Sequence, residues 1–182
     1  ADMSQPISNT MLPVDTERFQ TLLNTNNKPA QFDVISCQFA LHYFFKNRDT
    51  WTGFVNNVKT YLKPGGIFIG TCMNGVAVDQ MFRSGSTSEI TGPFGRIRKK
   101  YNTDFTTLSV PLGQTIETFI ESIGTSNDEY LVDVNWFIHQ MMLHNIELHH
   151  PKRHPVFEFG TASFGAIYDA MQQKNRKIDI PE

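Results

Sequence analysis

The sequence has little of what marks secreted, disulfide-bonded or membrane-spanning proteins. It has two cysteines, Cys37 and Cys72, each inside an apolar run, which suits buried and reduced thiols better than a disulfide framework. No apolar stretch approaches the roughly 20 residues of a membrane-spanning helix. Residues 1–5 carry neither the basic nor the apolar part of a signal peptide. We therefore expect one intracellular domain with no segment that crosses a membrane.

An excess of charge of one sign is also lacking. The chain has 16 Lys and Arg against 18 Asp and Glu, a formal net charge of -2 at pH 7. Such a chain has no overall attraction to nucleic acid, so contact with phosphates must come from a local cluster. One candidate is the run Arg96, Arg98, Lys99 and Lys100, which follows a turn rich in glycine and proline and is expected on a strand. The alternative interpretation of this run is a solvated strand face.

Motifs of several other enzyme classes are missing. The sequence has no Gly-x-x-x-x-Gly-Lys phosphate loop and no Gly-x-Ser-x-Gly nucleophile elbow, so guanylyl transfer and serine hydrolysis are unsupported. His149, His150 and His154 crowd one short segment, but no cysteine or carboxylate completes a zinc pattern at the usual spacings. We predict no metal site.

The spacing of apolar residues predicts a strand, a helix and a second strand in succession. Residues 31–40 and 67–71 are nearly continuous apolar runs, as expected of buried strands in a parallel sheet. Between them we predict a helix capped by Asp49 or Thr50 and ended by a type II turn in the Lys-Pro-Gly-Gly segment at 63–66. Its apolar stripe comprises Trp51, Phe54, Val55, Val58 and Leu62. This βαβ unit predicts the α/β fold class.

Five further elements are predicted from periodicity and capping residues. They are a helix beginning at Asp15, a strand over 115–123 that is exposed on one side and has Ile116, Phe119 or Ile120, and Ile123 as its apolar residues, a helix opened by Asp128 and Glu129 and closed at Asn145, a strand over 156–159, and a last helix over 164–171.

The most specific motif stands at the end of the first apolar strand. It reads Gln38-Phe39-x-x-His42-Tyr43, and it closely resembles the Gln-Phe-x-x-His-Tyr hallmark of mRNA cap guanine-N7 methyltransferases. The Lys-Pro-Gly-Gly turn is shared by methyltransferases of every substrate class, so the His-Tyr motif decides the family. Three further segments resemble the family in the same order, namely residues 1–4, 62–71 and 129–132.

The resemblance implies a Rossmann-like class I S-adenosylmethionine-dependent methyltransferase fold, incomplete in this chain. The first βα unit with its glycine-rich motif and the final strand are expected outside residues 1–182, which makes the chain a partial methyltransferase domain. The implied activity is transfer of a methyl group from S-adenosylmethionine to N7 of the guanosine cap, converting GpppRNA to m7GpppRNA. Implied partners are capped RNA and other capping-enzyme domains or subunits. The implied location is the nucleus for a cellular enzyme, and the host cytoplasm or virion for one from a large DNA virus.

The resemblance also implies which residues read the cap. It assigns His42 to guanine O6 and Glu129 to the N1 and N2 donors, with Tyr43 and Phe39 as an apolar wall against the base. A satisfied core histidine and a charge at a helix N-terminus are the plainer interpretations of His42 and Glu129. If they do read the cap, their side chains should approach within a guanine's width of each other beside Gln38.

The cofactor and the phosphates are assigned in the same way. By resemblance, Gln38 and Phe39 line the cofactor and Asp2 contacts its adenine, although Asp2 could also be an exposed terminal residue. The nominated phosphate contacts are Arg96, Arg98 and Lys99. No catalytic acid or base is expected, because guanine N7 carries a free lone pair and positioning supplies the rate. Two other functions remain open, a catalytically silent subunit of a capping complex and a small-molecule methyltransferase.

Overall fold

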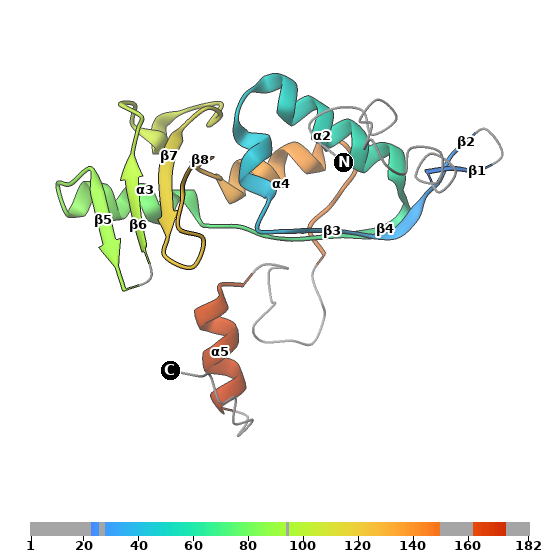
Figure 1. The fold of residues 1–182 in the computed structure, drawn as a ribbon. Coiled ribbons are helices and arrows are strands. Elements are labelled where there is room, and N and C mark those ends of the chain that lie inside the picture. Colours follow the sequence, from blue (N-terminus) through green and yellow to red (C-terminus); the bar gives the residue numbers. More distant parts are fainter. Residues whose placement is uncertain (1–22, 26–27, 94, 150–161, 174–182) are drawn as a thin grey trace. The chain divides into compact units, whose positions relative to one another are not determined.

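A computed structural model describes residues 23–25, 28–93, 95–149 and 162–173 (Figure 1). The helix predicted from Asp15 and the strand predicted over 156–159 lie outside these residues, apart from Leu23, which is helical. Asp2 lies outside them too. The chain divides into two compact units, Ala1–Phe137 and Ile138–Glu182.

The predicted βαβ unit is confirmed in the first unit. Strand β3 (Phe32–Gln38) is followed by helix α2 (Arg48–Tyr61) and strand β4 (Leu62–Thr71), and the two strands pair in parallel up to Gln38 opposite Thr71. Figure 1 shows α2 running alongside them. Gly65 has a φ of 77°, the positive value that a type II turn requires of the residue after its proline. A short antiparallel ladder, β1 (Asn24–Thr25) and β2 (Lys28–Pro29), precedes β3.

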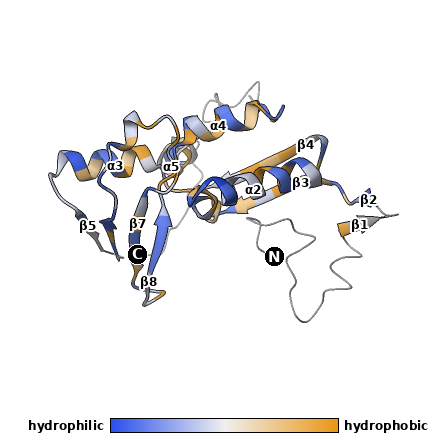
Figure 2. Cartoon of the chain, turned by 90° about the horizontal axis from the view of Figure 1, so that it is seen from above, coloured by the Kyte–Doolittle hydropathy of each residue, from blue (hydrophilic) through white to orange (hydrophobic). Residues whose placement is uncertain are grey.

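The prediction that both strands are buried is wrong for one of their faces. Val34, Ile67 and Ile69 are 53%, 47% and 46% exposed. Within the part of the chain that the structure describes, β3 and β4 pair only with each other, and α2 covers the face that carries Ile35 and Phe68. Figure 2 shows the apolar residues along these strands. The uncovered face therefore remains exposed.

Cys37 of β3 and Cys72, the residue after β4, are free thiols, as predicted, but each is half-buried rather than buried. Burial raises the pKa of both, and the neighbouring Cys37 contributes to raising that of Cys72 to about 11. The thiolate forms are therefore disfavoured at neutral pH.

Helix α2 begins two or three residues earlier than a cap at Asp49 or Thr50 would place it. Asn47 is the N-cap, with its side-chain oxygen accepting from the backbone N–H of Thr50 at 2.9 Å. The Thr50 hydroxyl accepts in turn from the Asn47 backbone N–H at 3.1 Å, which completes a capping box. The predicted stripe is buried, and Leu62 caps the C-terminus before the chain enters β4. The indole of Trp51 packs 4.8 Å from that of Trp136.

The second sheet of this unit is antiparallel, in the order β5 (Glu89–Gly92), β6 (Gly95–Lys99), β7 (Thr115–Ile120) and β8 (Ser126–Tyr130). Helix α3 (Gly75–Ser84) packs on one face and η3 (Phe105–Thr107) joins the same core. That core comprises Val78, Phe82, Tyr101, Phe105, Ile116 and Leu131. Of these elements, only the strand over 115–123 and the strand bearing the basic run were predicted.

The prediction for β7 is confirmed in type and at Ile116, but not at Ile120 and Ile123. Ile116 and Thr118 are buried, whereas Ile120 and Ile123 are 43% and 58% exposed. Successive side chains of a strand point to opposite faces, so the residue that shares the buried face with Ile116 is Thr118, which is polar.

The predicted opening of a helix at Asp128 and Glu129 is wrong. Both residues belong to β8, whose backbone pairs with β7 and places Glu129 opposite Ile116. Helix α4 (Val134–Met142) starts later, where the Asp133 carboxylate accepts from the Trp136 backbone N–H at 3.0 Å. α4 ends at Met142, three residues before the predicted Asn145, whose φ of 60° and N–H bond to the Met142 carbonyl still mark it as the residue that terminates the helix.

In the second unit, helix α5 (Phe164–Gln173) confirms the predicted last helix. No helix among the described residues is long and apolar enough to cross a membrane. The same residues contain no group of three or more His, Cys, Asp or Glu side chains that could hold a metal ion.

Candidate functional site

The site begins where the chain leaves the sheet after β3. Phe39 adopts a φ of 51°, and its N–H donates to both the carbonyl and the hydroxyl oxygen of Thr71 at 3.0 Å. The left-handed conformation turns the backbone away from the strand and into the short helix η2 (Leu41–Phe45). A non-glycine residue held in this conformation is strained, and such strain gathers at functional sites.

η2 and β8 bring two polar side chains together from distant parts of the sequence. The Nε2 atom of His42 lies 3.8 Å from Oε2 of Glu129, and the two side chains are only 10% and 16% exposed. This distance is too long for a hydrogen bond. It is short enough for both atoms to face neighbouring groups on one edge of a planar ligand. The prediction that these residues approach each other is confirmed.

Both atoms retain the capacity to bind a ligand. His42 Nε2 is buried and has no hydrogen-bond partner within the described ranges. Glu129 is held through its other oxygen, Oε1, which accepts from the Thr118 hydroxyl at 2.8 Å. A buried nitrogen without a partner carries a desolvation cost that a ligand could relieve. The pair therefore presents one nitrogen and one carboxylate oxygen side by side.

Burial lowers the pKa of His42 below its ordinary 6.5, and the Glu129 carboxylate opposes this shift without overcoming it. The imidazole is therefore neutral near pH 7. A neutral ring has one N–H donor and one acceptor nitrogen, so it can donate to a carbonyl oxygen without bringing a full positive charge into the site.

Two aromatic side chains accompany the pair in the same loop. The Tyr43 ring lies 4.1 Å from the His42 ring at an interplanar angle of 56° and is half exposed. The Phe39 ring is 65% exposed. An exposed ring beside a polar pair offers a surface against which a planar base can pack.

Gln38 lies at the carboxyl end of β3, the end at which open α/β sheets bind ligands. Its side-chain oxygen accepts from the Thr71 hydroxyl at 2.9 Å, and its amide nitrogen donates to the Ser36 hydroxyl at 3.0 Å. These bonds hold the amide at the strand end next to Phe39.

The basic run does not form one patch. Register places Arg96 and Arg98 of β6 opposite Phe119 and Glu117, on the face away from Ile97 and the core. The neighbouring Lys99 points to the other face and lies 3.8 Å from the Asp79 carboxylate.

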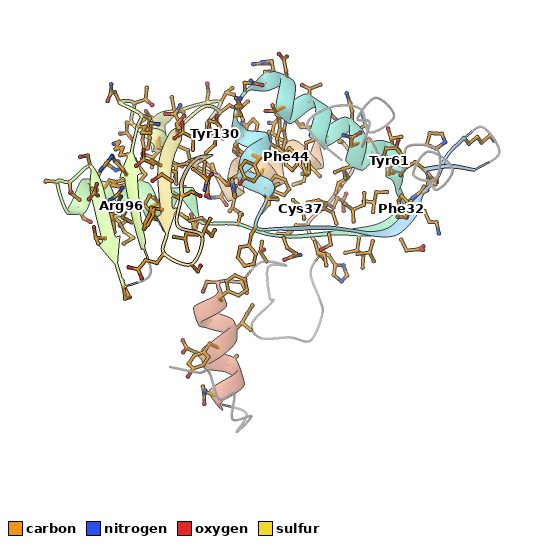
Figure 3. The ribbon with its side chains drawn as sticks, in the orientation of Figure 1. Phe32, Cys37, Phe44, Tyr61, Arg96 and Tyr130 are labelled. Atoms are coloured by element: carbon orange, nitrogen blue, oxygen red, sulfur yellow. The ribbon has the colours of Figure 1, made fainter. Side chains whose placement is uncertain are left out.

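Carboxylates already neutralise most of these cations. Arg98 pairs with Glu89 and Glu117 at 2.7 and 3.3 Å, and Lys100 pairs with Asp128 at 2.7 Å. Arg96, labelled in Figure 3, lies over the Phe119 ring at 5.3 Å, and no carboxylate pairs with it in the described part of the chain. Of the three nominated residues, Arg96 is the one best able to contact a phosphate.

Sequence reasoning missed Thr118, which bonds to Glu129. The available signal was a single polar residue two positions after Ile116, at an inward place of an otherwise apolar strand face. A buried hydroxyl at such a place requires a partner. The partner could not be named while Glu129 was expected on a helix.

Comparison with known proteins agrees with the family resemblance of the Gln-Phe-x-x-His-Tyr motif. A family model described as the mRNA (guanine-N(7))-methyltransferase domain matches residues 8–176. Proteins named mRNA cap guanine-N(7) methyltransferase are 29% identical over 117 residues in Caenorhabditis briggsae, and 35% identical over 81 residues in Caenorhabditis elegans. These alignments cover 64% and 44% of this chain. A probable mRNA-capping enzyme of Acanthamoeba polyphaga mimivirus is 29% identical over 67% of the chain. The aligned part spans 31%, 21% and 11% of these relatives, so the chain corresponds to less than a third of their length.

Proposed function

Because this chain belongs to the mRNA (guanine-N(7))-methyltransferase domain family, we propose that the protein it comes from methylates N7 of the guanosine cap of mRNA. The methyl group comes from S-adenosylmethionine, and the product is m7GpppRNA. The observation that carries the proposal is the contact between His42 and Glu129, whose facing atoms are 3.8 Å apart.

The groups of this pair are complementary to guanine. The ring edge of guanine displays the O6 acceptor next to the N1 and N2 donors. A neutral His42 donates to O6, and the Glu129 carboxylate accepts from N1 and N2. Adenine presents an amino group and an acceptor at the corresponding positions, which would leave the desolvated carboxylate unpaired at a cost of about 1 to 3 kcal/mol. The pair therefore selects guanine.

The neighbouring rings complete this binding site. Tyr43 lies against the His42 ring and half of its surface is exposed. We assign Tyr43, with Phe39, to the apolar wall that packs against the base. The strained backbone of Phe39 supports this assignment, because the fold maintains a costly conformation there.

The chemistry requires no acid or base from the protein. Guanine N7 has a free lone pair at neutral pH, so no proton is removed before attack. The contribution of His42, Glu129 and Tyr43 is to hold N7 in line, and positioning of this kind is worth roughly 7 to 11 kcal/mol. The Glu129 carboxylate also favours the positive charge that develops on the methylated ring.

We propose that S-adenosylmethionine, which supplies the methyl group from its sulfonium sulfur, binds at the carboxyl ends of β3 and β4. Gln38 is fixed there by its bonds to Thr71 and Ser36, and the Phe39 ring beside it is exposed. We assign Gln38 and Phe39 to cofactor contact, together with Asp2, which lies outside the described residues.

Capped RNA is the proposed partner, with other capping-enzyme domains or subunits as further ones. Arg96 is the proposed phosphate contact, and Arg98 and Lys99 are secondary because carboxylates already pair with them. We propose an intracellular protein, in the nucleus if cellular and in the host cytoplasm or virion if viral.

The complete protein tests this function directly. It should methylate GpppRNA at N7 when supplied with S-adenosylmethionine, and it should leave ApppRNA unmodified, as read by mass spectrometry of the released cap. A catalytically silent subunit would bind GpppRNA without methylating it. A small-molecule methyltransferase would show no preference for GpppRNA over ApppRNA, and either result would overturn the proposal.

A further inference from the structure

We infer that Thr118 is a positioning residue of the guanine site, which fixes the Glu129 carboxylate in the orientation that faces His42. The inference rests on the function proposed above. It concerns a residue that touches neither the base nor the reacting atoms in that function, and whose effect passes through Glu129.

The sheet register places the two side chains together. Thr118 of β7 stands opposite Asn127 of β8, and Glu129 stands opposite Ile116. Residues directly opposite in an antiparallel pair share a face, so Thr118 and Glu129 are diagonal neighbours on one face. Their separation is set by the backbone ladder rather than by a loop.

The hydrogen bond between them is partly buried and charge-assisted. Thr118 is 5% exposed, and its hydroxyl lies 2.8 Å from Glu129 Oε1 and 3.4 Å from the Asn127 carbonyl oxygen. A hydroxyl has one proton to donate, and the carboxylate is the nearer and stronger acceptor. Binding one carboxylate oxygen orients the other, Oε2, toward His42 Nε2.

The consequence is a pre-organised acceptor. A glutamate side chain has three rotatable bonds, and a free carboxylate would have to be ordered each time guanine binds, which costs conformational entropy. The Thr118 hydroxyl holds the carboxylate before the ligand arrives. Threonine also suits the strand, since its branched side chain packs in β7 while its hydroxyl donates.

The test uses the complete enzyme with Thr118→Val, which keeps the shape of the side chain and removes the donor. The affinity for GpppRNA should fall about tenfold, as expected for a hydrogen bond to a charged group. Preference for GpppRNA over IpppRNA, whose base lacks the 2-amino group, should narrow, because a loose carboxylate no longer matches both donors. Thr118→Ser should restore most of both properties.

A double-mutant cycle separates positioning from a general effect on structure. In a Glu129→Ala background the Thr118→Val change should have no further effect on the Kd for GpppRNA, because Thr118 acts on the base only through the Glu129 carboxylate. Equal losses in both backgrounds would overturn the inference. So would unchanged affinity and unchanged preference in Thr118→Val alone.

Two controls keep these outcomes interpretable. Thr115→Val makes the same change on the opposite face of β7, where the hydroxyl donates to the Gly113 carbonyl oxygen, and it should leave GpppRNA affinity unchanged.

Affinity for S-adenosylmethionine reports whether each variant is folded. If Thr118→Val loses this affinity, Thr118→Ala takes its place in the test. An unmutated enzyme that does not distinguish GpppRNA from ApppRNA contradicts the proposed function, whereas a discriminating enzyme with an inert Thr118→Val contradicts this inference alone.

Discussion

Tyr101 donates a hydrogen bond from its hydroxyl to Asp79, a carboxylate with no exposed surface. Arg83 of the same helix lies 3.0 Å from the second oxygen of Asp79, and Lys99 lies 3.8 Å from the first. A buried carboxylate is tolerated only when partners of this kind surround it. The pair thereby ties α3 to the segment after β6.

Tyr101→Phe should destabilise the protein by about 1 to 3 kcal/mol, because it removes the hydroxyl donor while the Asp79 carboxylate stays buried. Urea denaturation of the complete protein, with and without the change, measures the loss. Tyr130→Phe on β8 is the matched control and should be close to neutral, because Tyr130, unlike Tyr101, does not belong to the buried cluster that contains Phe82 and Phe105. If Tyr101→Phe and the unmutated protein unfold at the same urea concentration, the contact with Asp79 adds little to stability.

Glu129→Gln should reduce kcat/KM for GpppRNA by roughly 100-fold while leaving cofactor affinity intact. Glutamine offers one acceptor, its amide group opposes a guanine donor, and the negative charge that favours the cationic ring is gone. The loss should therefore appear in kcat as well as in KM. Asp128→Asn, next to it on the opposite face of β8, is the control. A Glu129→Gln enzyme working at the unmutated rate would remove the guanine-reading role.

Acid should destabilise the folded protein through His42. Its folded pKa is lowered, so as the pH falls below about 6.5 the unfolded chain takes up a proton that the folded chain does not. The contribution of His42 to stability is full above that pH and is lost as the pH drops toward the lowered pKa of the folded state. Melting temperatures at pH 7.5 and 5.5 should differ more for the unmutated protein than for His42→Gln. The exposed His139→Gln serves as the control, and an equal difference in all three proteins would contradict the prediction.

Arg96→Ala should raise the KM for capped RNA and flatten its salt dependence by roughly 0.7 to 0.9 in the slope of log affinity against log salt, the value for one phosphate contact. Arg98→Ala should change this slope less, because Glu89 and Glu117 already pair with Arg98. Kinetics at several salt concentrations distinguish the two. Identical slopes for Arg96→Ala and the unmutated enzyme would return the whole run to a solvated strand face.

Asn47→Ala should cost about 1 kcal/mol of stability, because the change removes the acceptor for the Thr50 N–H in the capping box. Asn56→Ala, at an exposed position inside α2, should be neutral or slightly stabilising since alanine is the better helix former. Thermal unfolding of both variants measures the difference. Equal effects would mean that the cap at Asn47 contributes nothing to α2.

The βαβ unit was predictable because its signals are local. A continuous apolar run, a helical stripe and a Pro-Gly turn each lie within a few residues of one another, and the Gln-Phe-x-x-His-Tyr motif falls at the strand end that they define. The exposed face of β3 and β4 was not predictable. An apolar residue reads the same in sequence whether or not another element covers it.

The location of Glu129 could not be predicted because it depends on non-local pairing. Asp128 and Glu129 precede an apolar helical stripe, the usual arrangement at a helix N-terminus, and only the backbone ladder between β7 and β8 overrules that interpretation. Its meeting with His42 was nevertheless expected, through the resemblance to a family. Arg96 and Arg98 point to one face of β6 and Lys99 to the other, so these three residues do not act as a single patch.

The φ of 51° at Phe39 restricts how this position can vary. Glycine adopts that backbone conformation without a steric penalty, and asparagine does so at a reduced one, so both would relieve the strain. Neither offers a ring to a bound ligand. In a library that randomises residue 39, selection for thermal stability and selection for methyl transfer should therefore enrich different amino acids. If Phe39 packs against the base as proposed, phenylalanine at this position reflects selection for activity and not for stability.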